Sequence, residues 1–136
     1  MLDLPWTTVR GLAALKALAL EDGPLTSGAL GREAHLTPAR AARMIRELKA
    51  AGLVASAGHR GWTLARPASD ITVLEAVEAL GASRSPSERC RADWSMCDDR
   101  GGCVLAPLCR QAHESLIEVF RGHTLADLRA ELPVLP

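Results

Sequence analysis

The sequence predicts a mainly helical protein with a winged helix-turn-helix domain, a two-stranded wing and a long helix near the C-terminus. Three short helical patterns lie before residue 52, two strand-like stretches around a Gly-x-x-Gly loop follow, and a longer amphipathic pattern starts near residue 107. With 136 residues the chain suffices for one compact domain and an appended arm. Only 3% of the residues are aromatic. The core must therefore consist of Leu, Ala, Val and Ile, which favours closely packed helices.

The first two helices are predicted from apolar spacing and from their end signals. Apolar residues recur with helical spacing over residues 7–20, and Gly23 and Pro24 then end the first helix. A shorter helix follows, with Thr26 as its N-cap and an end near Ala34.

The third helix has the clearest limits. Thr37 supplies a hydroxyl N-cap, Pro38 takes the first helical position, where its missing N–H costs nothing, and Gly52 suits the left-handed position after the helix. These signals predict a helix over residues 38–51. At 100° per residue one side is apolar and the opposite side is cationic. The apolar side carries Ala41, Met44, Ile45 and Leu48, and the cationic side carries Arg40, Arg43 and Arg46.

A β-hairpin is predicted after the third helix. Residues 53–57 and 62–65 form its strands around a four-residue loop, Gly58–Gly61, and Pro67 closes it. Trp62 lies beside the basic loop, where it either packs into the core or stacks on a sugar or base. Core packing is the commoner role of a tryptophan in a strand.

The next helix is predicted from a capping box. Thr72 and Glu75 have the spacing of that motif, and the helix they start runs to Leu80 and ends at Gly81. Residues 82–107 then show no periodicity and carry many charges. A connection of this length inside a compact domain is usually functional or disordered.

A longer helix is predicted over residues 107–121, with Gly122 after it. Thr124 and Asp127 are expected to cap a last short helix that ends before Pro133. The long helix has an apolar stripe that either packs against a second copy of the chain or covers its own domain. The stripe consists of Leu108, Ala112, Leu116 and Val119, with Phe120 beside it.

The cationic third helix and the hairpin loop together indicate a DNA-binding surface. The chain as a whole is neutral, but residues 1–31, 32–66 and 67–136 carry net charges of −1, +5 and −4, as expected for a polyanion-binding module within a neutral protein. Any solvated amphipathic helix shows a similar pattern, but the hairpin that follows favours DNA binding. We expect Arg43 to contact a base edge, because arginine binds guanine through two N–H groups. The other expected DNA contacts are Thr37, Arg40, Arg46, Lys49, His59 and Arg60.

Four cysteines lie within 20 residues of an otherwise cysteine-free chain. Cys90, Cys97, Cys103 and Cys109 have the spacing C-x6-C-x5-C-x5-C, which is wider than the paired C-x2-C of zinc fingers. A loop around an iron–sulfur cluster tolerates wider gaps, because its thiolates reach different irons. Nearby arginines favour the thiolate form. The spacing therefore favours a cluster, and the alternatives are a zinc site and unligated thiols that form a redox-switch disulfide.

The wing and the cysteine segment together resemble a known family. Residues 58–67 (GHRGWTLARP) and 70–80 (DITVLEAVEAL), with Cys90, Cys97 and Cys103, resemble the bacterial iron–sulfur cluster regulators and nitric-oxide sensors (IscR and NsrR). The closing run HTLADL also fits, so the resemblance covers nearly the whole chain. It implies a homodimeric winged-helix transcription regulator, which binds a palindromic promoter and in which the long helix crosses its partner.

The resemblance also implies an iron–sulfur cofactor, with [4Fe–4S] favoured over [2Fe–2S]. In the family three cysteines are completed by a variable fourth ligand, either a histidine shortly after the third cysteine or a carboxylate near the partner's N-terminus. This chain departs from that pattern, since the position three residues after Cys103 is Ala106. The candidates for the fourth ligand are Cys109 first, then Asp3, then His113.

The expected organisation is a DNA-binding domain at residues 1–80, a cysteine-bearing cluster loop at 81–106, and a dimerisation helix with a short C-terminal helix at 107–136. No apolar run is long enough for a membrane span. The start lacks the order of a secretory signal, so we expect a reducing cytoplasm. An enzyme is not expected, because no nucleotide-binding glycine motif or paired carboxylates occur.

Two further functions stay open on the sequence alone. The first is a thiol–disulfide or zinc-stabilised winged-helix repressor, which a brown colour of anaerobically prepared protein would exclude. The second is a small iron–sulfur carrier or electron-transfer protein, in which the basic helix only docks a partner. Loss of sequence-specific DNA binding in Arg43→Ala would argue against the carrier.

Overall fold

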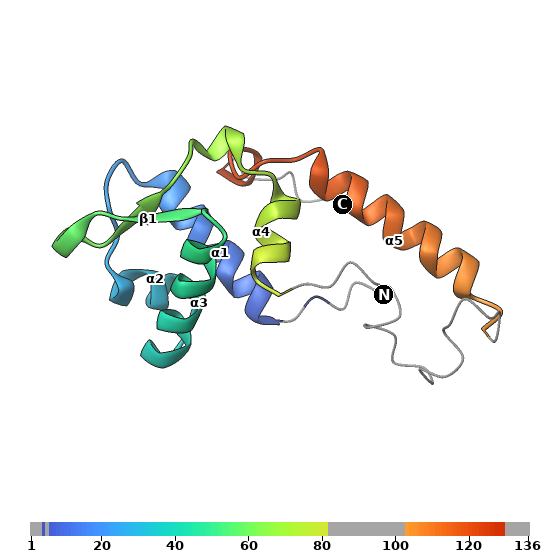
Figure 1. The fold of residues 1–136 in the computed structure, drawn as a ribbon, viewed down its shortest axis with the longest axis horizontal. Helices are drawn as coiled ribbons and strands as arrows, with labels where there is room; N and C mark the ends of the chain where they lie inside the picture. The colour runs from blue at the N-terminus through green and yellow to red at the C-terminus, as the bar shows by residue number, and fades with distance from the viewer. Residues whose placement is uncertain (1–3, 5, 82–102, 130–136) are drawn as a thin grey trace, which may run out of the picture.

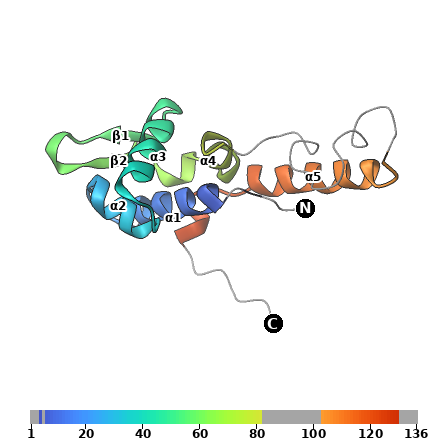
Figure 2. The same ribbon diagram turned by 90° about the horizontal axis from the view of Figure 1, so that it is seen from below.

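The computed structural model describes residue 4 and residues 6–81 and 103–129. Within these residues, four helices and a two-stranded hairpin form one packed unit, and a fifth helix extends away from it at the end opposite the hairpin (Figure 1, Figure 2). The elements are α1 (Trp6–Leu20), α2 (Ser27–Glu33), α3 (Pro38–Ala50), β1 (Val54–Ser56), β2 (Trp62–Leu64), α4 (Val73–Ala79) and α5 (Ala106–Arg121). This mainly helical arrangement with an antiparallel two-stranded wing confirms the predicted fold class.

The core lies between α1, α3, α4 and the wing, and it is almost entirely aliphatic. Leu15, Leu48 and Ile71 are fully buried, and Thr8, the buried polar residue of α1, donates from Oγ1 to the carbonyl oxygen of Leu80 at 3.2 Å. This bond ties the first turn of α1 to the end of α4. Each helix buries one face in this core, so tertiary packing determines their positions.

The end of α3 follows the predicted pattern closely. Gly52 has φ +75°, its N–H donates to Lys49 O at 3.0 Å, and Leu53 N–H donates to Leu48 O at 3.0 Å. These two bonds form a Schellman motif, which turns the chain from α3 into β1. Ala51 is the C-cap, one residue beyond the last helical residue.

The wing, Val54–Leu64, differs in detail from the predicted hairpin. Its strands are shorter, with Val54 opposite Leu64 and Ser56 opposite Trp62. The connection has five residues instead of four, because Gly58–Arg60 form a 3-10 turn. Ala57 N–H donates to Gly61 O across this turn at 2.8 Å. Trp62 also exchanges two backbone hydrogen bonds with Leu25, at 2.8 and 3.0 Å, which fastens the wing to the α1–α2 connection.

The segment after α5 folds back onto the four-helix unit. Leu125 is fully buried, and Leu125 N–H donates to Ile71 O at 2.9 Å. The predicted last helix is a single 3-10 turn, Asp127–Arg129, within the described residues. At its start Thr124 and Asp127 interact as expected, since Thr124 N–H donates to the Asp127 carboxylate at 2.7 Å, which is one half of a capping box.

The predicted capping box of α4 is present and is extended by an arginine. The Thr72 hydroxyl accepts from Glu75 N–H at 3.1 Å, and Glu75 Oε2 accepts from Thr72 N–H at 2.9 Å. Arg66 Nη2 lies 3.0 Å from Glu75 Oε1. The hydrogen bond from the Thr72 backbone is the main cause that lowers the pKa of Glu75; burial opposes it and Arg66 reinforces it.

We expect Glu75 to make stability depend on pH. Its folded-state pKa is lowered below 4.5, its ordinary value, so its contribution is present above about pH 4.5 and is lost as the pH falls through the folded pKa. Glu75→Gln should therefore unfold more easily than the wild type at pH 7, with a difference that shrinks towards pH 3. Urea unfolding measured across this range tests the prediction, and Glu21→Gln, at an exposed acid, is the matched control. A difference that does not change with pH would contradict it.

Candidate DNA-binding surface and cysteine segment

Helix α3 separates its apolar and cationic sides as predicted. Ala41, Met44, Ile45 and Leu48 are buried against the core. The opposite side is exposed over the whole length of the helix and carries four cations. These are Arg40, Arg43, Arg46 and Lys49.

Thr37 occupies the N-cap position of α3, but its hydroxyl makes no capping hydrogen bond. The predicted N-cap position is therefore confirmed, but the hydroxyl hydrogen bond expected there is absent. At α2 that bond is made, since Thr26 Oγ1 accepts from Ala29 N–H at 3.1 Å. Pro38 already fixes the first backbone angle of α3 and has no N–H to satisfy. The Thr37 side chain is exposed at the start of the basic face.

Arg43 forms an ion pair within α3 that sequence reasoning missed. Its Nε lies 3.1 Å from Glu47 Oε1, and its side chain remains 78% exposed. The i, i+4 spacing of the two residues was the available signal. An exposed pair of this kind is worth about 0.2 to 1 kcal/mol, so it orients the guanidinium without preventing another contact.

The wing places a histidine and an arginine at its tip and holds its tryptophan against the core. His59 and Arg60 are exposed in the 3-10 turn. Trp62 packs against the core and donates from Nε1 to Ser27 Oγ at 3.0 Å. The ammonium of Lys49 lies 5.7 Å from the centroid of the Trp62 ring. Trp62 therefore links the wing to α2 and to the end of α3.

The cysteine segment is described only from Cys103 onward. Cys90, Cys97 and Asp3 lie outside the described residues, while Cys103 and Cys109 are half-buried thiols without a disulfide. His113 follows Cys109 by one turn of α5, and its Nε2 is buried without a hydrogen-bond partner. No three His, Cys, Asp or Glu side chains among the described residues are close enough together to hold a metal ion.

A comparison with protein families identifies the family of this chain. The model of the Rrf2 family, described as iron-dependent transcriptional regulators, matches residues 7–131. This chain belongs to the Rrf2 family. It is therefore a DNA-binding transcriptional regulator rather than an enzyme, and the expected resemblance is confirmed at the level of the family.

Solved structures of other regulators have the same fold as this Rrf2 regulator. CymR (YrzC), the global cysteine regulator of B. subtilis, aligns with a TM-score of 0.76 and 22% identity over 97% of this chain and 99% of that one. IscR of T. potens aligns with a TM-score of 0.69 and 26% identity over 90% and 82% of the two chains. The oxidized form of Staphylococcus aureus CymR aligns with a TM-score of 0.73 and 19% identity over 98% and 100%. No curated protein matches the chain.

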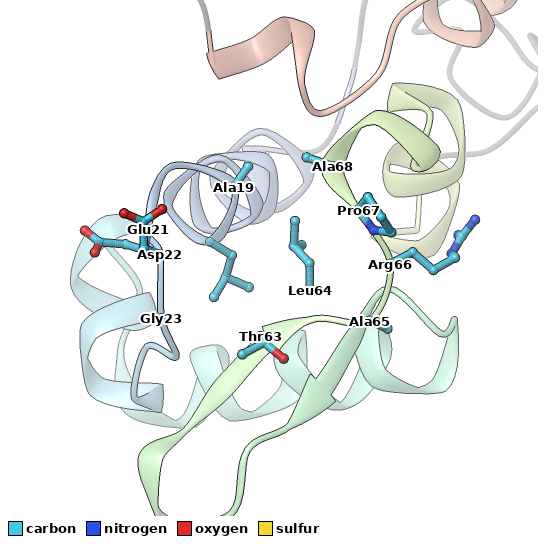
Figure 3. Close-up of a pocket in the computed structure, with 11 residues that line it drawn as sticks. Ala19, Glu21, Asp22, Gly23, Thr63, Leu64, Ala65, Arg66, Pro67 and Ala68 are labelled. Carbon is cyan, nitrogen blue, oxygen red and sulfur yellow. The ribbon is translucent and has the colours of Figure 1, made fainter.

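A surface hollow of this Rrf2 regulator lies away from both candidate sites. It has a volume of about 520 Å³ and lies between the end of α1 and β2, with Leu64 at its centre (Figure 3). Arg66 extends away from it, and its guanidinium binds Asp70 O and Glu75. The hollow gathers no cluster of chemically reactive side chains, and we assign it no role.

No described helix of this Rrf2 regulator is both long enough and apolar enough to cross a membrane.

Proposed function

We propose that this Rrf2 regulator is a homodimeric repressor that binds a palindromic promoter and carries an iron–sulfur cluster responsive to redox state or nitric oxide. The exposed cationic side of α3 supports the DNA-binding part. The half-buried donors Cys103, Cys109 and His113, which lie before α5 and in its first half, support the metal-binding part. A cytoplasmic setting, in which thiols stay reduced, belongs to the same proposal.

In the DNA complex α3 enters the major groove and the wing contacts the flanking backbone. Arg43 lies in the half of α3 that reaches the bases, and it reads a guanine edge. The remaining contacts are to phosphates, which fix the register of the protein on the duplex. They come from Thr37, Arg40, Arg46, Lys49, His59 and Arg60.

Helix α5 supplies the dimer contact in this proposal. Leu108 is 62% exposed and Val119 is 55% exposed, and Ala112 of the predicted stripe is also exposed. Leu116 of the stripe and Phe120 beside it are half-buried, but the described residues of the same chain leave the other three uncovered, and α5 protrudes from the four-helix unit (Figure 2). A second copy of α5 would cover it, and two recognition helices then meet two half-sites one helical turn apart.

The donors present fit an iron–sulfur centre. Thiolates are the usual ligands of such clusters, and Cys103 and Cys109 bracket the start of α5 as free, half-buried thiols. The Nε2 atom of His113 is buried without a hydrogen-bond partner, which is rare in folded proteins and leaves this nitrogen available as a ligand. We propose Cys90, Cys97 and Cys103 as ligands, with Cys109, Asp3 or His113 in the fourth position.

The proposed organisation explains how the cysteine loop, residues 81–106, can act on DNA binding. Cys90, Cys97 and Cys103 would hold the cluster, which would supply irons that change oxidation state or react with nitric oxide. Cys103 lies three residues before the first residue of α5, Ala106, whose N–H donates to Cys103 O at 3.2 Å. A displacement of this loop would therefore move the dimerisation region, residues 107–136. That movement would in turn change the spacing of the DNA-binding domains, residues 1–80 of each copy.

A thiol–disulfide repressor is the second candidate. Its support is that Staphylococcus aureus CymR, which has the same fold, is known in an oxidized form. A zinc-stabilised repressor and a small iron–sulfur carrier are the remaining alternatives. All three differ from the main proposal in colour, metal content or DNA binding.

We expect protein prepared without oxygen to be brown and to contain iron and acid-labile sulfide, about four of each per chain for the favoured cubane. Cys90→Ala, Cys97→Ala and Cys103→Ala should each lose most of the iron. Among Cys109→Ala, Asp3→Ala and His113→Ala, the variant at the fourth ligand should show the largest loss. Colourless protein, or zinc in place of iron, would refute the cluster.

A further inference from the structure

Two arginines lie over the ring of Trp6, the first residue of α1. Trp6 is 48% exposed, so its ring is a surface feature beside the start of α3. The guanidinium carbon of Arg10 lies 4.7 Å from the ring centroid, and that of Arg40 lies 5.2 Å from it. Both distances are within the range of a cation–π contact. The ring therefore connects α1 to one of the exposed cations of the recognition helix.

Arg10 makes one side of this arrangement rigid. Its Nη1 donates to His35 O at 2.7 Å and to Ala34 O at 3.2 Å, at the turn between α2 and α3. A cation is favoured there, because the last carbonyls of a helix carry partial negative charge. His35 itself has φ +52°, which is a left-handed conformation that exposes its carbonyl at the turn. Arg10 thus fixes the position of the Trp6 ring relative to that turn.

Arg40 is held differently from its neighbour on α3. Arg43 is paired with Glu47, whereas Arg40 has no carboxylate partner among the described residues. A cation–π contact uses none of the N–H donors of a guanidinium and leaves its charge unneutralised. Arg40 is therefore oriented by the Trp6 ring while all its donors stay available for an anion.

We propose that Trp6 is a positioning residue of the DNA interface, which holds the Arg40 guanidinium at the N-terminal end of α3 for a DNA phosphate. A long side chain that is already ordered loses less conformational entropy when it binds. Trp6 thereby raises affinity without adding charge to the interface. This inference rests on the DNA binding of the family and on the proposed phosphate contact of Arg40, and it needs no cluster.

A double-mutant cycle on the full-length protein tests the inference. The probe is a DNA duplex selected from a random pool by the wild type, and binding is followed by fluorescence anisotropy. We expect Trp6→Leu, which keeps an apolar side chain but removes the aromatic face, to weaken binding about two- to fivefold, equivalent to an exposed cation–π contact. Trp6→Phe should keep most of the affinity.

The decisive comparison is Trp6→Leu in the Arg40→Ala background, where we expect it to have no further effect. In an Arg46→Ala background its full effect should remain. Arg40→Ala should also lower the salt dependence by about one ion, whereas Trp6→Leu should leave that slope nearly unchanged. Val9→Ala, at another exposed apolar residue of α1, should leave affinity unchanged.

Additive effects of Trp6→Leu and Arg40→Ala would overturn the inference, because the ring would then act independently of Arg40. Wild-type affinity of Trp6→Leu would also overturn it. Thermal unfolding of each variant is measured alongside. If Trp6→Leu unfolds at the assay temperature, the same cycle is run with Trp6→Met, which also removes the aromatic face.

Discussion

Gly61→Ala is expected to destabilise the protein by about 3 kcal/mol or more. Gly61 has φ +112°, which only glycine adopts readily, and a Cβ atom there would lie 2.2 Å from Leu25 O and 2.6 Å from Leu25 C. Backbone strain of this kind costs about 1 to 3 kcal/mol, and an overpacked contact adds about 1 to 3 kcal/mol. Because the clashing atoms belong to the backbone, the Leu25–Trp62 pairing must break to relieve them. Urea unfolding of the two proteins measures the difference.

Gly58→Ala is the matched control in the same turn. Gly58 also has positive φ, +65°, but nothing lies within 4 Å of the added Cβ. Only the left-handed backbone penalty of about 1 to 2 kcal/mol applies there. We expect Gly61→Ala also to weaken DNA binding more than Gly58→Ala does, because the wing loses its attachment to the α1–α2 connection. Equal destabilisation by the two substitutions would show that the close contact with Leu25 has no energetic importance.

Arg43→Ala is expected to weaken binding to the selected duplex by about 5- to 150-fold, which corresponds to the 1 to 3 kcal/mol of a bidentate base contact. The loss should be accompanied by relaxed preference at one base pair of each half-site. Selection of binding sites with the variant protein, followed by affinity measurements on single-base variants, tests both parts.

Arg46→Ala is the comparison for this experiment, since Arg46 is exposed on the same side of α3 and is assigned to a phosphate. It should weaken binding to all duplexes alike and reduce the salt slope by about one. If Arg43→Ala behaved in the same way, its role would be a phosphate contact. If Arg43→Ala lost no affinity, the proposed orientation of α3 in the major groove would be contradicted.

The helices were predictable from the sequence because their end signals are local. Thr26, Pro38 and Gly52 act within one turn of the chain, and α3 begins and ends within a residue of its predicted limits. The capping box at α4 was found for the same reason. Thr37 shows the limit of such signals, because a residue type that suits a cap need not make the hydrogen bond.

The contacts that position the DNA-binding residues were not predictable, because they join residues distant in sequence. Trp62 contacts Ser27 and Lys49 only once α1, α2 and α3 have packed together, and the same holds for the contact of Trp6 with Arg40. The docking of Leu125 on Ile71 is of the same kind. Hydrophobic periodicity identifies which face of a helix or strand is buried, but it does not identify the element against which that face packs.

The cysteine spacing predicted which type of side chain binds the metal, but it did not predict how the ligands are arranged in space. Thiolates converge on a metal only when the whole segment folds around it, so the spacing and the family resemblance together left Cys109, Asp3 and His113 as candidates for one position. The buried Nε2 of His113 could not be found from sequence, since it depends on the packing around α5.

The most direct test compares the DNA affinity of cluster-loaded and cluster-free protein in the absence of oxygen, with the same duplex, dimer concentration and salt. We expect the two affinities to differ by about 5- to 150-fold, which is the usual range of coupling between two sites, and we expect iron and sulfide reconstitution to restore the loaded value. Equal affinities of the two forms would contradict the proposal that the cysteine segment controls DNA binding.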